Sequence, residues 1–139
     1  MKYWLLKTEP DVYSIEDLKR DGRAMWDGVR NIKANNYIKK MEIGDYVFIY
    51  HTGKERSIVG IGKIVTSSYP DPTSDNPKFH AIDVEYVKRL VNPVTLKEIK
   101  ESLSFTDWEL VNLPRLSVMP VKVEYWHKVL TLAGDNFEI

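Results

Sequence analysis

The pattern of hydrophobic and polar residues predicts strands in the middle of the chain and short helices around them. Residues 3–6 form a short apolar run, which is typical of a buried strand. Residues 46–50 are apolar on both faces, which indicates a strand in the centre of a sheet. Apolar and acidic residues alternate over 82–86, as in a strand with one buried face. A sheet is therefore expected to form the core.

Two helices are predicted in the first third of the chain. Ser14, with Asp17 three residues later, has the pattern of a capping box, and Gly22 is expected to end this short helix. A second helix is expected from about residue 30 to residue 41, where Gly44 follows.

Two more helices are predicted near the other end. The sequence TLKE at 95–98 is a capping box for a helix that runs to about Ser102. The last helix is expected over about 122–132, with Val123, Trp126 and Leu130 on its buried face and Gly134 after its end.

Glycine and proline shape the segment that follows the central strand. Residues 58–65 read as a strand in which Gly60 and Gly62 lie on one face, so we expect a patch free of side chains there. Three prolines in residues 69–77 predict a rigid loop rather than a strand.

The order of these elements indicates an α+β fold. Because the strands form one block with helices before and after it, we expect a strongly curved, mainly antiparallel sheet flanked by short helices and able to close into a small barrel. A chain of 139 residues has the usual size of one domain, so residues 1–139 are expected to form a single domain.

Composition narrows the classes of protein. No apolar stretch approaches the roughly 20 residues of a membrane span, and Lys7 interrupts the first apolar run, so a cytoplasmic protein without a membrane partner is expected. The chain has no cysteine and three scattered histidines, a pattern that predicts neither a metal site nor a disulfide. We expect no cofactor, and a monomer.

Charge is distributed unevenly although the net charge is zero. Ten basic and five acidic side chains lie between Lys19 and Lys63, so the rest of the chain is acidic. This basic region is consistent either with a local contact to an anionic partner or with a solvated helix face.

Signals for catalysis are few. The chain has neither the nucleophile elbow of a hydrolase nor a glycine-rich loop for nucleotide phosphates. His51 with a carboxylate such as Glu9, Asp11 or Asp27 leaves open a nuclease or base-modifying hydrolase as an alternative. An adaptor for protein or for a small metabolite is a third hypothesis.

Aromatic residues favour a binding function. Among four tryptophans and eight tyrosines, Trp26 is followed at once by Asp27 and Gly28, which predicts an aromatic ring at the edge of a loop. Such rings stack on nucleobases, and the side chains of Arg30 and Asn31 have donors and acceptors suited to a base edge. The alternative is that Trp26, like Trp4 and Trp126, only packs in the core.

Five segments together resemble the EVE-domain family of the PUA-like superfamily. They are YWLLKTEP at 3–10, WDGVRN at 26–31, YH at 50–51, YPDPT at 69–73 and RLSVMPV at 115–121. The resemblance runs from Tyr3 to about Leu132. It implies a PUA-like twisted pseudo-barrel, and a non-catalytic module that binds nucleic acid by holding a modified base, such as a methylated or oxidised cytosine, in a pocket.

The resemblance also implies a set of site residues. The base pocket is expected to be lined by Trp26, Val29, Arg30, Asn31, Tyr50, His51, Ser14 and Ser117. The rim and the contacts to the flanking backbone are expected at Lys7, Pro10, Lys33, Lys39, Lys40, Lys54 and Arg115.

Several of these roles have alternatives. Ser14 is also suited to serve only as a helix cap, His51 only as a buried histidine bonded to a neighbouring backbone group, and Arg115 only as an ion-pair partner of Asp27. Many relatives continue after Arg30-Asn31 with Gln-Ala-Arg-Asn, whereas this chain has IKANN at 32–36, which leaves the roles of Lys33 and Asn35 open.

Overall fold

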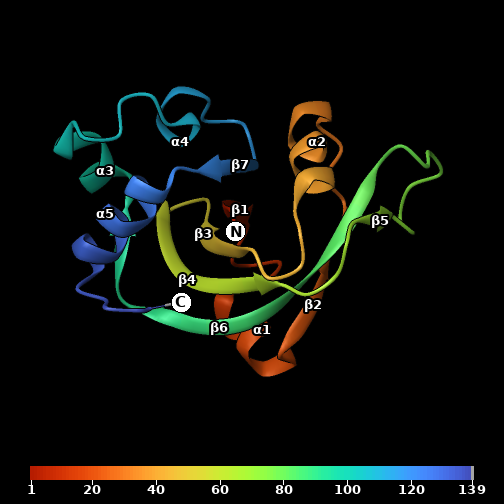
Figure 1. Ribbon diagram of the computed structural model, residues 1–139, viewed down its shortest axis with the longest axis horizontal. Coiled ribbons are helices and arrows are strands. Elements are labelled where there is room, and N and C mark those ends of the chain that lie inside the picture. Colours follow the sequence, from red (N-terminus) through yellow and green to blue (C-terminus); the bar gives the residue numbers. More distant parts are fainter. Residues whose placement is uncertain (139) are drawn as a thin grey trace.

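The computed structural model describes residues 1–138, which form a curved mixed sheet with short helices on both sides (Figure 1). Its strands are β1 (Tyr3–Thr8), β2 (Arg23–Trp26), β3 (Tyr46–His51), β4 (Ser57–Ile64), β5 (Tyr69–Pro70), β6 (His80–Thr95) and β7 (Val118–Val121). Its helices are α1 (Ile15–Asp21), α2 (Ile32–Lys40), α3 (Leu96–Ser102), α4 (Glu109–Asn112) and α5 (Val123–Ala133).

The sheet has the order β2-β6-β4-β3-β1-β7, and β5 pairs with β6 beside this path. Within residues 1–138, β1 and β3 pair in parallel and the other strand pairs are antiparallel. The 16-residue strand β6 pairs with β2 near its start and with β4 along the rest of its length. It bends strongly along the way, so the sheet curls into the expected pseudo-barrel (Figure 1).

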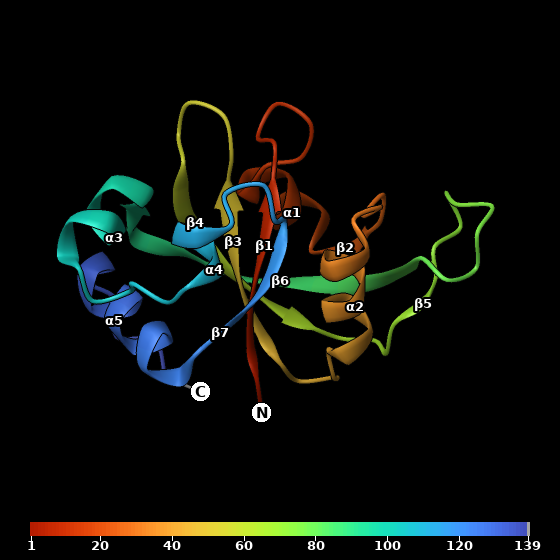
Figure 2. The ribbon, with the colours of Figure 1, turned by 90° about the horizontal axis from the view of Figure 1, so that it is seen from above.

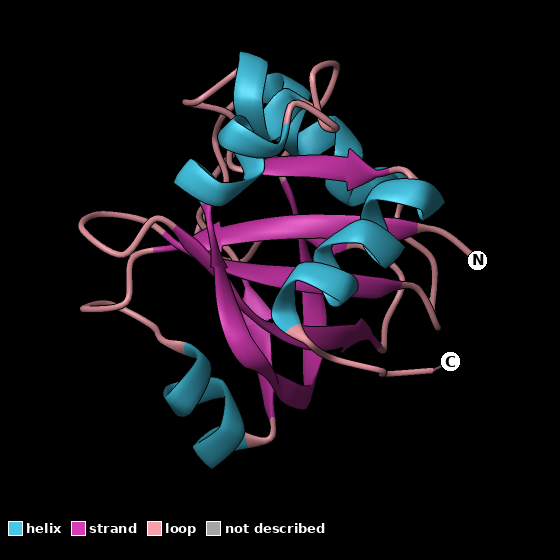
Figure 3. Cartoon of the chain, turned by 90° about the vertical axis from the view of Figure 1, so that its left-hand side faces the viewer, coloured by secondary structure: helices cyan, strands magenta, loops and turns pink. Residues whose placement is uncertain are grey.

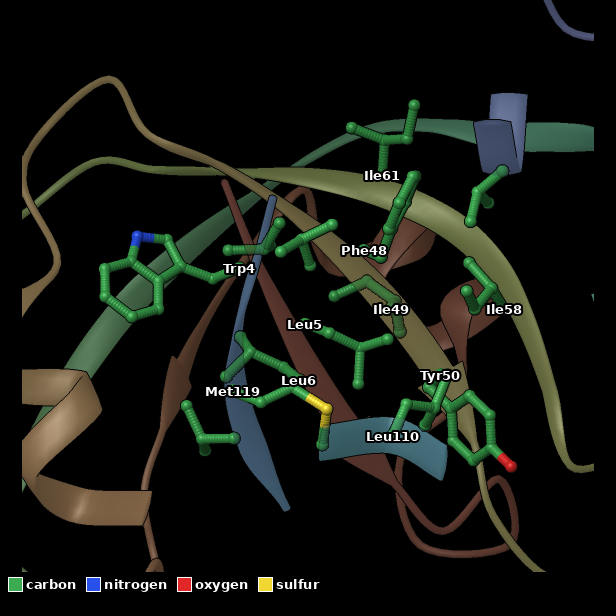
Figure 4. Close-up of a cluster of buried hydrophobic side chains, with 14 of the residues drawn as sticks. Trp4, Leu5, Leu6, Phe48, Ile49, Tyr50, Ile58, Ile61, Leu110 and Met119 are labelled. Atoms are coloured by element: carbon green, nitrogen blue, oxygen red, sulfur yellow. The ribbon is translucent and has the colours of Figure 1, made fainter. Parts of the chain in front are cut away.

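Apolar side chains fill the inside of this curve. The central strand β3 lies between β1 and β4, as the sequence predicted, and its Phe48 ring stacks on Trp126 of α5 with 4.0 Å between ring centres. Trp4 and Trp126 are buried, which confirms their predicted place in the core. Figure 4 shows Trp4 among the buried side chains around β1 and β3. Helix α1 lies on the other side of the β4–β6 arc from the remaining helices (Figures 1 and 3).

Most helix ends agree with the sequence prediction. Both capping boxes are present: Ser14 with Asp17 at α1, and Thr95 with Glu98 at α3. Helix α2 begins at Ile32, two residues later than predicted, because the side chain of its N-cap residue accepts the Ala34 N–H at 2.9 Å. That N-cap residue is Asn31.

Two local predictions were wrong. Val123 is 56% exposed in the first turn of α5, while Trp126 and Leu130 of that helix are buried. Tyr69 and Pro70 form a two-residue strand where a loop was expected. Trp26 does lie at the edge of a loop, as predicted, but it is the last residue of the short strand β2, which the sequence did not predict. Both strands exist because the first residues of β6 offer them a partner, and that partner is far away in the sequence.

The expected patch at Gly60 and Gly62 is also wrong, because other atoms of the protein fill it. A methyl group on Gly60 would lie 2.5 Å from Cδ1 of Ile15 and 2.9 Å from the carbonyl oxygen of Lys88. On Gly62 it would lie 2.6 Å from a methyl group of Val84. These glycines let helix α1 and strand β6 approach β4 closely.

Substituting Gly60 by alanine is therefore expected to destabilise the fold by about 1–3 kcal/mol, because the backbone oxygen of Lys88 has to move. Urea unfolding measures this change. The Ile15→Ala substitution removes the side-chain atoms nearest to Gly60. The double variant Gly60→Ala/Ile15→Ala should therefore lose less free energy of unfolding than the two single variants lose together. Additive costs would show that the crowding at Gly60 is unimportant.

Within residues 1–138, no helix has the combination of length and apolar character that crossing a bilayer demands.

Candidate functional site

A cavity of about 460 Å³ opens between the end of β1 and the loop that joins β2 to α2. We call it the Trp26 cavity. Its walls come from three segments that are far apart in the sequence: residues 7–13, residues 24–30 and Ser117 before β7. Figure 2 shows the β1–α1 loop and the β3–β4 loop projecting from this same end of the molecule.

Two aromatic rings form one corner of the cavity. Trp26 is 9% exposed and pairs with Ile82 of β6, so the sheet fixes its backbone. The ring of Tyr13 meets the indole edge-on, with 6.2 Å between the ring centres. Burial and the hydrogen bond that the Tyr13 hydroxyl donates to Asp21 raise the pKa of Tyr13 to about 12, so this ring stays neutral.

A buried carboxylate holds the opposite wall in place. The side chain of Asp71, which follows β5, accepts hydrogen bonds from the Gly28 N–H at 2.8 Å and from Nη1 of Arg30 at 3.0 Å. Its other oxygen accepts the N–H and the hydroxyl of Thr73 at 2.8 and 2.6 Å. Burial by itself would raise the pKa of Asp71, but these hydrogen bonds outweigh it and hold the pKa well below its usual range.

Arg30 is thereby fixed at the edge of the cavity. Besides its bond to Asp71, it donates from Nη2 to the hydroxyl of Thr73 at 2.9 Å, and its guanidinium lies 5.5 Å from the ring centre of Phe79. The side chain remains 41% exposed. A guanidinium has five N–H donors, so several remain for a ligand.

Asn35 ties the same loop to the sheet. This buried side chain in α2 donates from Nδ2 to the carbonyl oxygens of Val29 and His80, at 3.1 and 3.0 Å, and its Oδ1 accepts the His80 N–H at 2.9 Å. All of its main donors and acceptors are used within the protein, so its role is to hold Val29. Asparagine is an unfavourable residue inside a helix, and that was the available signal for this role.

The structure brings together only part of the predicted pocket. Trp26, Val29, Arg30 and Ser117 line the cavity, and Lys7 joins them from the rim. Ser14 and Asn31 do not line it, because each caps a helix with its side chain. Asp71 was not predicted as a site residue, although it lies in the YPDPT segment that indicated a rigid loop.

Tyr50 and His51 pair across the sheet with Lys7 and Thr8 of the cavity wall, but they do not line the cavity themselves. Tyr50 is buried, with Nζ of Lys7 5.4 Å from its ring centre. His51 is 2% exposed; its Nε2 accepts the Ile15 N–H at 3.0 Å, and its Nδ1 lies 2.7 Å from the carboxylate of Glu55. Both ring nitrogens are thus engaged, so His51 offers no free lone pair to act as a base.

The predicted rim residues occupy different places. Lys7 donates from Nζ to the carbonyl oxygen of Pro114 at 2.9 Å, and burial lowers its pKa. Lys54 lies in the β3–β4 loop and Arg115 in the loop before β7, both exposed. The ion pairs found among residues 1–138 include none between Arg115 and Asp27. Pro10, in the β1–α1 loop, does not line the cavity.

The basic residues of α2 separate into two groups. Lys33 lies in the first turn, close to Arg30, whereas Lys39 and Lys40 lie in the last turn. That last turn leads into Gly44, whose N–H bonds to the final residue of β4, Ile64, at 2.8 Å. Lys39 and Lys40 therefore lie at the far end of α2 from Val29 and Arg30, the cavity residues that precede this helix.

Comparison with known proteins gives a consistent result. The sequence pattern of the EVE domain matches residues 2–132. Thymocyte nuclear protein 1 of Homo sapiens is 34% identical, over 94% of this chain and 73% of that protein. A crystal structure of a protein from Agrobacterium tumefaciens has a TM-score of 0.95 at 35% identity, over 99% of this chain and 97% of the other.

A second solved structure is the human THYN1 protein in complex with 5-methylcytosine containing DNA. It has a TM-score of 0.83 at 34% identity, with complete coverage of both chains. The expected PUA-like fold is confirmed by this likeness. With a family match over nearly its whole length, the chain belongs to the EVE domain family.

Proposed function

We propose that this protein is a non-catalytic module that binds nucleic acid and holds one modified base, a methylated or oxidised cytosine or a similar base, in the Trp26 cavity. The observation that carries the proposal is the cavity itself, with an aromatic corner and a wall held by Asp71 and Asn35. The THYN1 protein, bound to 5-methylcytosine containing DNA in its crystal structure, supports DNA as the nucleic acid.

The chemistry of the walls suits a planar base with an added apolar group. A cavity of about 460 Å³ lies within the range of small-ligand sites, so a base swung out of its stack has room to enter. Trp26 and Val29 supply apolar contact for the ring and for a methyl group. Asp27, Lys7, Arg30 and Ser117 supply acceptors and donors for the polar edge.

The fixed wall also lowers the cost of binding. Because Asp71 holds Gly28 and Arg30, and Asn35 holds Val29, little side-chain or loop freedom is lost when a base enters. The site is thus already organised for its ligand.

A direct test compares two duplexes that differ only in one methyl group, at C5 of a single cytosine. A methyl group that fits an apolar pocket contributes roughly 10-fold or more in affinity, so we expect at least about tenfold tighter binding of the methylated duplex. Fluorescence anisotropy titrations measure both affinities.

A cavity-filling variant locates the binding site. Ser117→Phe places a larger side chain in the cavity and should remove the preference for the methylated duplex, whereas Ser67→Phe, on an exposed loop position, should retain it. Equal affinities of the unmodified protein for both duplexes, and for a panel with oxidised cytosines, would contradict the proposed function.

A further inference from the structure

A second hollow, with a volume of about 440 Å³, lies between the β3–β4 loop and the start of α3. We call it the α3 groove. Four basic side chains line it, and they are Lys54, Arg56, Lys97 and Lys100. Two carboxylates, Glu55 and Glu101, share its walls.

The carboxylates offset only part of this charge, because the groove has four basic side chains and two acidic ones. Glu55 lies 2.7 Å from the ring of His51, and Glu101 lies 3.9 Å from Lys97. Among the ion pairs within residues 1–138, none involves Lys54, Arg56 or Lys100. The groove therefore presents unpaired positive charge to an anionic ligand.

The loop that carries two of these charges is held firmly. The N–H of Thr52 donates to the carbonyl oxygen of Thr8 at 3.0 Å, so the β3–β4 loop is tied to the end of β1, and Thr8 itself lines the Trp26 cavity. The carbonyl oxygen of Arg56 accepts the N–H of Leu96 at 2.8 Å, which ties the loop to the start of α3.

Positive charge also continues from the groove to the cavity. Lys7, at the rim of the Trp26 cavity, lies over the ring of Tyr50. Arg56 comes directly before Ser57, which pairs across the sheet with His51, the residue after Tyr50. Burial raises the pKa of Tyr50, and the charge of Arg56 opposes that rise. Lys7 and the loop that carries Arg56 thus lie at the same end of neighbouring strands, on either side of β3.

We propose that the α3 groove binds the phosphodiester backbone of the nucleic-acid strand whose modified base occupies the Trp26 cavity. The inference rests on the proposed function and adds the direction in which the strand leaves the cavity, over Tyr50 toward α3. Mobile, solvated lysines and arginines are the side chains that neutralise phosphates, and a chain of phosphates matches a row of charges that continues past the cavity rim.

The protein offers a matched control set of basic residues that do not line the α3 groove. Lys39, Lys40 and Lys63 are also basic, and Lys63 lies near the end of β4 opposite to Ser57, roughly 20 Å away at 3.3 Å per residue. Changing three basic residues to glutamine in either group alters the net charge of the protein equally.

The test compares the triple variant K54Q/R56Q/K100Q with the control K39Q/K40Q/K63Q. Affinity for a methylated duplex and for its unmethylated twin is measured at several salt concentrations, with thermal unfolding to verify folding. Each lost phosphate contact should lower the salt slope by about one. Between 50 and 200 mM salt, the unmodified protein should lose roughly 20- to 40-fold more affinity than the groove variant.

The outcomes separate the two proposals. A smaller slope in the groove variant alone, with the preference for the methylated base retained, supports both. A smaller slope without any such preference in the unmodified protein supports the groove and overturns the proposed function. Equal slopes in the groove variant and the unmodified protein, equal changes in both triple variants, or no binding of nucleic acid at all would overturn the groove proposal.

Discussion

Replacing Trp26 by leucine is expected to weaken binding of a 5-methylcytosine duplex by roughly 5- to 150-fold, because stacking of a base on an aromatic ring is worth about 1–3 kcal/mol. The Trp26→Phe variant keeps an aromatic face in the same corner beside Tyr13, so it should retain most of the affinity. Anisotropy titrations at constant salt measure the series.

A separate control is needed because Trp26 is buried and its loss also affects folding. Removing a large buried side chain costs about 3–5 kcal/mol when alanine replaces it, so leucine is the better substitution. Trp108→Leu truncates another buried tryptophan, at the N-cap of α4, and should lower stability without changing affinity. Wild-type affinity in a folded Trp26→Leu variant would contradict the role of this ring.

The Asp71→Asn substitution is expected to cost about 3 kcal/mol of stability at neutral pH, since hydrogen bonds to a charged group are worth about 1.5–3 kcal/mol each and an amide satisfies fewer of the four. In a domain of this size the melting temperature should fall by about 10 °C. Affinity for the methylated duplex should fall as well, because Gly28 and Arg30 lose their fixed positions.

The pH dependence of this effect has a definite sign. The pKa of Asp71 is lower in the folded protein than in the unfolded chain, so its stabilising effect is fully present above the unfolded pKa of about 3.9. As the pH falls below that value, the effect is progressively lost. Urea unfolding should therefore show a large difference between the natural protein and Asp71→Asn at pH 7, and a smaller one at pH 3.

Asp75 provides the matched control, since it lies in the same loop and is exposed. Asp75→Asn should leave both stability and affinity nearly unchanged at either pH. If Asp71→Asn behaves in the same way as Asp75→Asn, the cavity wall does not depend on the buried carboxylate.

Local signals in the sequence account for most of the fold. Apolar runs predicted β1 and β3, and the capping boxes at Ser14 and Thr95 predicted the start of α1 and of α3, because each of these signals acts within a few residues. Strands β2 and β5 were missed for the opposite reason. Each is too short to show a period, and each exists because it pairs with the first residues of β6.

The residues of the site were likewise predicted only in part from the sequence. The WDGVRN segment was recognised as a wall of the pocket, and Trp26, Val29 and Arg30 of that segment do line the cavity. Asn31 was assigned to the pocket as well, although its side chain closes the first turn of α2. In this case the local hydrogen bond decides, and an asparagine before a helix is itself a signal for an N-cap.

What the sequence determined by itself is the longer strands and helices and the segment that carries the aromatic wall, since both follow from neighbouring residues. Only the tertiary structure decided which side chains meet. Asp71 reaches Gly28 and Arg30 across more than 40 residues, and Ser117 joins Lys7 because β7 pairs with β1. A cavity is a property of packed segments, so it is created by long-range pairing, which leaves no periodic trace in the sequence.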